Sequence, residues 1–228
     1  EFGIPQCRHR VILLGIRSDI PIDLNSLLLT KTDQVSVKSI LKNMPKLRSG
    51  LSKELDTSSN WQNITNSALS NAHRYINGPK AQLRLGERSS SRGAAFIRTS
   101  GTLSNDIPKS LHNWLIDEQI EGVVQHESRG HMSSDIERYS FVSLYGQIHD
   151  RSPRIKELPI DLLPNHKNVD SGNFVDRFKV QLANYPSKTI TSHIAKDSHA
   201  FIHYDPFQAR GLTVREAARL QTFPENYF

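Results

Sequence analysis

The segment from Arg210 to Pro224 defines both ends of a helix within fifteen residues. Thr213 and Glu216, three residues apart, form a capping box, in which each side chain accepts a hydrogen bond from the other residue's backbone N–H. Pro224 lacks a backbone donor and prevents the helix from continuing far. The sequence therefore predicts a short helix that begins at Thr213 and ends before Pro224.

Arg215 and Arg219 are i, i+4 neighbours on this helix and give it a basic stripe. Composition alone favours solvated arginines on a surface helix, because charged faces usually point to water. The other side carries small, apolar and amide side chains: Val214, Ala217, Ala218 and Gln221.

The N-terminal part combines arginines with an apolar run. Val11–Ile16 is rich in β-branched residues and predicts a strand that is covered on both faces in a parallel sheet. If the extended conformation reaches back, Gln6, Arg8 and Arg10 project from one face. Their fixed donors suit a phosphate or the polar edge of a base. A structural salt-bridge cluster explains the same residues equally well.

The charge of the chain points to a polyanionic partner. The net charge is +6 and the pI is near 9.5. Residues 74–98 alone carry six basic residues and one acid, a net charge of +5. This window is rich in Gly and Ser, which predicts loops of the kind that commonly carry phosphate and base contacts, although a solvated basic loop remains the alternative. Its basic residues are Arg74, Lys80, Arg84, Arg88, Arg92 and Arg98.

Between the two ends, apolar residues recur at helical spacing and predict a mixed α and β fold. The aromatic stretch Phe201–Tyr204 predicts a strand. Ser134 and Glu137 form a second capping box and predict another helix start. The helical stripes cover residues 35–44, 61–75 and 107–115, and more weakly 174–182.

The stretch from Gln125 to His131 is polar and precedes that second helix. His126, His131 and Asp135 are possible metal ligands, but their spacing is not that of a zinc helix, so we expect no metal. Loop residues at a helix N-terminus can instead hold a phosphate. We therefore place Arg129 among the candidate phosphate contacts.

Several protein classes are excluded by composition. Mean hydropathy is −0.50, and no apolar run approaches the ~20 residues of a membrane span. The start shows no signal-peptide pattern, and a single cysteine cannot form an internal disulfide framework. We expect an intracellular protein with no membrane partner.

The segment Gly3–Ile16 and the segment Arg210–Pro224 resemble the eighth and ninth of the ten motifs of DNA (cytosine-5) methyltransferases, in the same order. The stretches around residues 125–137 and 192–203 are similar to recognition regions of bacterial members. The resemblance implies the edge of a doubly wound methyltransferase domain plus a smaller mixed target-recognition domain. Residues 1–17 would belong to the catalytic domain, 18–205 to the recognition domain, and 206–228 to the helix that anchors it.

The resemblance also implies a mechanism. Such enzymes flip the cytosine out of duplex DNA, attack it with a cysteine and methylate it from S-adenosylmethionine. Arg10 would contact the flipped base, supported by Arg8 and Gln6. The implied DNA-binding residues are Lys80, Arg84, Arg88, Arg92, Arg98 and Arg129, with Arg88 and Arg92 at base edges. The implied structural residues of the ninth motif are Arg210, Thr213, Arg215, Glu216 and Arg219.

The nucleophile and the cofactor loop that this mechanism needs are absent from the 228 residues. Cys7 follows Gln6 rather than a proline, and there is no Glu-Asn-Val and no Gly-rich loop after a first strand. We therefore expect an inactive recognition segment that binds no cofactor alone and whose partners are double-stranded DNA and the rest of the catalytic domain. A stand-alone DNA-binding or regulatory protein, or part of an RNA-directed relative, are the alternatives.

Overall fold

The computed structural model describes residues 2–77, 88–100, 103–164 and 177–227. Its helices and short strands confirm the predicted mixed α and β class. Within these ranges no helix is both long and apolar enough to span a bilayer. The helices are α1 (Val37–Leu41), α2 (Ser58–Asn77), α3 (Lys109–Leu115), α4 (Ser133–His149) and α5 (Val214–Leu220). The strands are β1 (Gln6–Cys7), β2 (Gly50–Leu51), β3 (Gly93–Arg98), β4 (Gly122–Glu127), β5 (Gly130–His131) and β6 (Ser187–Lys188).

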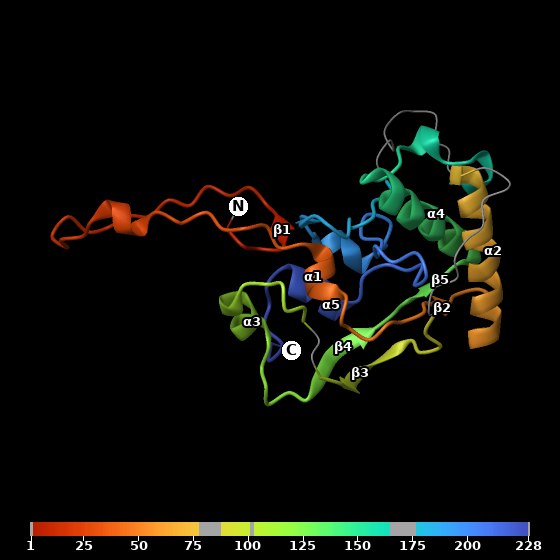
Figure 1. The fold of residues 1–228 in the computed structure, drawn as a ribbon, viewed down its shortest axis with the longest axis horizontal. Helices are drawn as coiled ribbons and strands as arrows, with labels where there is room; N and C mark the ends of the chain where they lie inside the picture. Colours follow the sequence, from red (N-terminus) through yellow and green to blue (C-terminus); the bar gives the residue numbers. More distant parts are fainter. Residues whose placement is uncertain (1, 78–87, 101–102, 165–176, 228) are drawn as a thin grey trace.

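The strands pair two by two. β3 and β4 form an antiparallel hairpin, while β1 pairs with β6 and β2 with β5 in parallel. Figure 1 shows the hairpin beneath α5 and shows α2 and α4 lying side by side at one end of the body. Four 3₁₀ turns complete the regular structure described: η1 (Leu24–Leu27), η2 (Ile155–Glu157), η3 (Ile160–Leu162) and η4 (Ser192–Ala195).

Two helices form the support for the rest of the body. α2 buries one face at helical spacing, as predicted, from Trp61 to Ala72. α4 is buried on nearly all sides between Ile136 and Gly146, as expected of a central helix. A side chain at Gly146 would lie 2.6 Å from Val180, so glycine is required for this close contact. The pair therefore fixes the end of the molecule opposite the N-terminal arm.

The predicted strand Val11–Ile16 does not form. The chain leaves the body after β1, runs out and back as an extended arm that carries η1, and re-enters at α1 (Figure 1). Leu13 is 91% exposed, and its neighbours in the run are also exposed. A strand covered on both faces needs flanking strands, and the described part of the chain supplies none beside this run.

Three smaller predictions also differ from the structure. α4 begins one residue before Ser134, and its N-cap, Met132, makes no side-chain hydrogen bond, so the second capping box does not form. The weak helical stripe of residues 174–182 starts outside the described residues, and its described part is extended, with Val180 bridging to Ile202. Phe201–Tyr204 contributes that bridge at Ile202 rather than a full strand.

Candidate nucleic-acid interface

The capping box that the sequence predicts is present. Thr213 Oγ1 accepts from Glu216 N at 3.1 Å, and Glu216 Oε2 accepts from Thr213 N at 2.8 Å. Both residues are buried. Because the two backbone donors at the start of α5 are satisfied by side chains, the helix can begin inside the protein rather than at its surface.

Glu216 also neutralises a buried arginine. The two terminal nitrogens of Arg210 donate to the two carboxylate oxygens of Glu216, each at 2.7 Å. Arg210 is 0% exposed and donates further to the Gly211 carbonyl and to Gln208. This bidentate pair lowers the pKa of Glu216, against the opposing effect of burial. The carboxylate therefore stays charged in the native protein.

The basic stripe of α5 does not face water. Arg215 is 0% exposed and donates to three carbonyl oxygens, those of Val124, Pro224 and Tyr227, at 3.0–3.1 Å. Arg219 is also fully buried and pairs with Glu225. The solvated-arginine interpretation is therefore wrong: these side chains connect α5 to β4 and to the residues that follow it.

Two histidines connect β4 and β5 to the start of α5 by hydrogen bonds. His126 Nε2 donates to the Pro45 carbonyl at 2.8 Å, since a carbonyl can only accept, and Nδ1 accepts from the Thr213 hydroxyl at 3.0 Å. Burial lowers the pKa of His126, so it is neutral at pH 7. His131 Nε2 accepts from Gly211 N at 3.3 Å, and burial lowers its pKa to about 3.

The three residues considered as metal ligands all have protein partners. Each ring nitrogen of His126 already has a protein partner. Asp135 pairs with Arg138 at 3.0 Å. Among the residues that the structure describes, no group of His, Cys, Asp and Glu could hold an ion. The histidines are thus structural, and they position the turn between β4 and β5.

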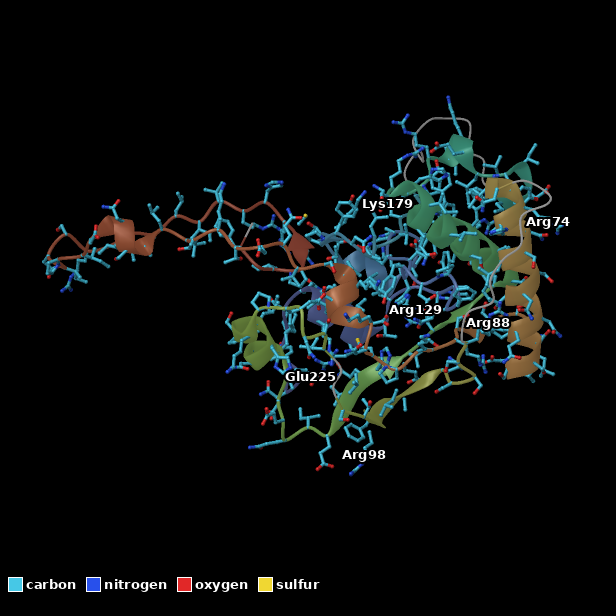
Figure 2. All side chains as sticks on the ribbon, viewed as in Figure 1. Arg74, Arg88, Arg98, Arg129, Lys179 and Glu225 are labelled. Carbon is cyan, nitrogen blue, oxygen red and sulfur yellow. The ribbon has the colours of Figure 1, made fainter. Side chains whose placement is uncertain are left out.

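That turn carries Arg129, which is exposed and makes one long hydrogen bond, 3.5 Å, to the Ala195 carbonyl. Figure 2 labels Arg129 near the centre of the view and Arg88 to its right. The turn is anchored on both sides: Ser128 Oγ donates to the Arg48 carbonyl, and β5 pairs with β2. A cationic side chain with freedom to reach a partner therefore stands on a fixed backbone.

The other sequence-predicted DNA contacts differ in their surroundings. Arg88 is half-buried, contacts Asn66 and lies over the Phe207 ring. Arg92 pairs with Asp56 at 3.2 Å. Arg98 is exposed at the end of β3 and pairs with Glu121 at 2.7 Å. Lys80 and Arg84 lie outside the described residues.

Asp56 is a site residue that the sequence did not indicate. It accepts from Arg48 at 2.5 Å and from Arg92 at 3.2 Å, so one carboxylate joins the loop after β2 to the start of β3. The two guanidiniums, despite the opposing effect of burial, lower the pKa of Asp56. A lone aspartate among serines and threonines gives no signal of this role, because both arginines are distant or unmarked in the sequence.

The arginine segment, residues 6–10, lies where the arm leaves the body. β1 pairs in register with β6, and Thr189 Oγ1 donates to the Cys7 carbonyl at 2.8 Å. Arg8 and Arg10 are exposed, and neither forms an ion pair with any residue in the described ranges. The alternative of a structural salt-bridge cluster therefore does not form there, and both guanidiniums face outward.

Comparison with known proteins now decides the family. The family model for C-5 cytosine-specific DNA methylase matches residues 1–228. The chain belongs to this family. Type II methyltransferase M.Bpa9945I of Bacillus paralicheniformis is 28% identical over 232 residues, which cover 100% of this chain and 42% of that protein.

Two further relatives match shorter regions. Type II methyltransferase M.AgeI of Thalassovita gelatinovora is 39% identical over 59 residues, 26% of this chain and 13% of its own length. Putative type II methyltransferase M.OihORF3336P of Oceanobacillus iheyensis is 39% identical over 54 residues, 24% of this chain and 11% of its own length. The chain thus spans less than half of the relatives that it matches. No solved structure matches it.

Proposed function

We propose that this chain is the DNA-recognition portion of a bacterial DNA (cytosine-5) methyltransferase, which methylates C5 of a flipped cytosine within a specific duplex sequence. Family membership supports a role in DNA methylation. The observation that carries the recognition role is the buried arginine and histidine network, which fixes the β4–β5 turn to α5 and leaves Arg129 exposed. Loops held by a rigid scaffold are where binding residues are concentrated.

The proposed division of the chain follows the resemblance. Residues 1–17 belong with the catalytic domain, 18–205 form the recognition domain, and 206–228 anchor it. Exposure of the apolar run at residues 11–14 supports the first assignment, because a soluble surface seldom leaves four consecutive apolar side chains uncovered. An enzyme that acts on genomic DNA would work in the cytoplasm, on the nucleoid.

S-adenosylmethionine would supply the methyl group, as it does generally for this family. The residues here do not fit that group: the 228 residues have neither a Pro-Cys pair nor a Gly-rich loop after a first strand, and Cys7 is an exposed member of the arginine segment. We propose that these residues alone neither bind S-adenosylmethionine nor transfer methyl groups. Calorimetric titration of the 228-residue chain should show no binding.

In the arginine segment, we assign Arg10 to the flipped cytosine, Arg8 to the same pocket or a nearby phosphate, and Gln6 to their orientation. The two guanidiniums are exposed and pair with no carboxylate among the residues that the structure describes, which supports this assignment. A contact made only to an extruded base acts late in the reaction. Arg10→Ala in the full-length protein should therefore depress the methylation rate while leaving duplex affinity nearly unchanged. Equal losses in rate and affinity would indicate a simple phosphate contact.

For base recognition, we assign Arg129 together with Arg88 and Arg92, and we assign Arg98, Lys80 and Arg84 to phosphates. Arg129 is favoured because no carboxylate in the described ranges pairs with it, whereas Arg92 must first leave Asp56.

The test compares Arg129→Ala with Arg74→Ala, an exposed arginine on α2 that we do not assign to DNA. An arginine bidentate to guanine contributes roughly 1–3 kcal/mol of discrimination at one position. Arg129→Ala in the full-length protein should narrow the affinity gap between the cognate duplex and one single-base variant by that amount. Arg74→Ala should leave the gap unchanged. If both variants keep the full gap at every position, Arg129 does not read a base.

A further inference from the structure

A basic cavity of 380 Å³ lies between η2, the residues around Lys179, and β6. Figure 2 shows Lys179 above Arg129 in the same view. Of the eight lining residues, four are cationic and one is acidic, so the cavity favours an anion. The lining residues are Arg151, Ser152, Pro153, Arg154, Glu157, Phe178, Lys179 and Lys188.

The one carboxylate in this cavity is already saturated. Glu157 accepts two hydrogen bonds from Arg151 at 2.6 and 2.8 Å, one from the Tyr145 hydroxyl at 2.9 Å and one from Arg154 N at 2.7 Å. The Arg151 guanidinium, first among these donors, holds the pKa of Glu157 well below its usual range. Glu157 thus neutralises Arg151, and the exposed Arg154 and Lys188 are the cations of the lining that it does not neutralise.

The cavity adjoins the arginine segment through one strand pair. Lys188 pairs in register with Cys7, and Thr189 next to it donates to the Cys7 carbonyl. Arg8 and Arg10 follow directly on β1. Lys188, which lines the cavity, therefore lies beside Cys7, the residue that precedes Arg8.

We propose that this cavity binds one backbone phosphate of the DNA strand that enters the arginine segment. The inference rests on the proposed function. A guanidinium can offer two parallel donors to phosphate oxygens, and ammonium groups add compact charge. A hollow of this size admits one phosphate with its neighbouring sugar, and its walls reduce screening by salt.

The test removes the cavity's outer charges from the full-length protein. Arg154 and Lys188 are both exposed, so Arg154→Ala/Lys188→Ala should fold normally. The matched control is Lys53→Ala/Lys156→Ala, which removes two exposed charges that do not line the cavity. Loss of one phosphate contact should lower the slope of log affinity against log salt by about 0.9 relative to the control.

A second arm locates the phosphate. The duplexes in this arm carry the cognate sequence, and in each of them one phosphate is replaced by a neutral methylphosphonate. For the wild-type protein, replacement at one position near the target cytosine should weaken binding. For the cavity variant, replacement at that position should cause no loss of affinity. The cavity variant could instead have the same slope of log affinity against log salt as the control, and lose affinity at the same methylphosphonate positions as the wild-type protein. That result overturns the cavity assignment while the proposed function stands. If the wild-type protein binds no duplex, both are overturned.

Discussion

Replacing Glu216 by glutamine should be among the most damaging single changes in this chain. The substitution keeps the shape of the side chain, and the new amide oxygen can still accept from Thr213 N. It removes the charge that neutralises Arg210, which is 0% exposed and has both terminal nitrogens on the Glu216 carboxylate at 2.7 Å. Breaking a buried ion pair from one side costs about 3–5 kcal/mol. The total free energy of unfolding of a folded domain is about 5–15 kcal/mol, so this loss is a large share of it.

Urea unfolding of the 228-residue chain, followed by tryptophan fluorescence, measures the effect. Glu216→Gln should lower the free energy of unfolding by about 3–5 kcal/mol without changing the denaturant slope. The double variant Arg210→Met/Glu216→Gln also removes the buried charge of Arg210, which Glu216→Gln leaves without a counter-ion. It should recover part of the lost free energy of unfolding, so the effects of the two substitutions should not be additive. A loss below about 1 kcal/mol for Glu216→Gln, or strict additivity, would refute the buried-pair argument.

Three further predictions concern stability. Burial lowers the pKa of His131 to about 3 and that of His203 to about 4. In the unfolded chain both histidines take up a proton near pH 6.5, so acid favours the unfolded state. The free energy of unfolding should therefore be highest above pH 6.5 and should fall as the pH falls toward 4, by up to ~1.4 kcal/mol per pH unit for each histidine. Urea midpoints that do not change between pH 7.5 and 5 would contradict this. Trp61→Phe, which leaves the buried Ser49 hydroxyl without its 2.9 Å donor, should cost about 1–3 kcal/mol in the same assay, and no change would show that Ser49 finds water. Leu13→Asp should alter the stability of this chain by less than ~0.5 kcal/mol, but should lower the melting temperature of the full-length protein clearly, since we propose that the catalytic domain covers the run. If Leu13→Asp destabilised the 228-residue chain and the full-length protein equally, the proposal that the run is covered in the full-length protein would be contradicted.

Local signals in the sequence were the ones that predicted structure well. The capping box at Thr213 and Glu216 needs only residues three apart, and it forms as expected. The apolar stripe of α2 likewise depends on spacing within one helix. The resemblance of the two end segments located the family, which the match over residues 1–228 confirms.

What the sequence could not predict depends on distant partners. Arg215 is buried because the carbonyl oxygens of Val124, Pro224 and Tyr227 receive it, and nothing in residues 210–224 indicates that β4 lies there. The apolar run at residues 11–16 matches a strand in composition, yet a strand needs a neighbour, and the described residues offer none. The DNA contacts and the division into domains remain predictions.

We propose that the full-length protein recognises one duplex sequence through this chain and methylates a cytosine within it. The most direct measurement is base-resolution sequencing of 5-methylcytosine in the DNA of cells that express the full-length protein, beside cells that express its Arg129→Ala variant. We expect methylation of one cytosine in a single sequence context, and a relaxed context at one base pair in the variant. Unmethylated DNA, or 5-methylcytosine confined to transfer RNA from the same cells, would contradict the claim.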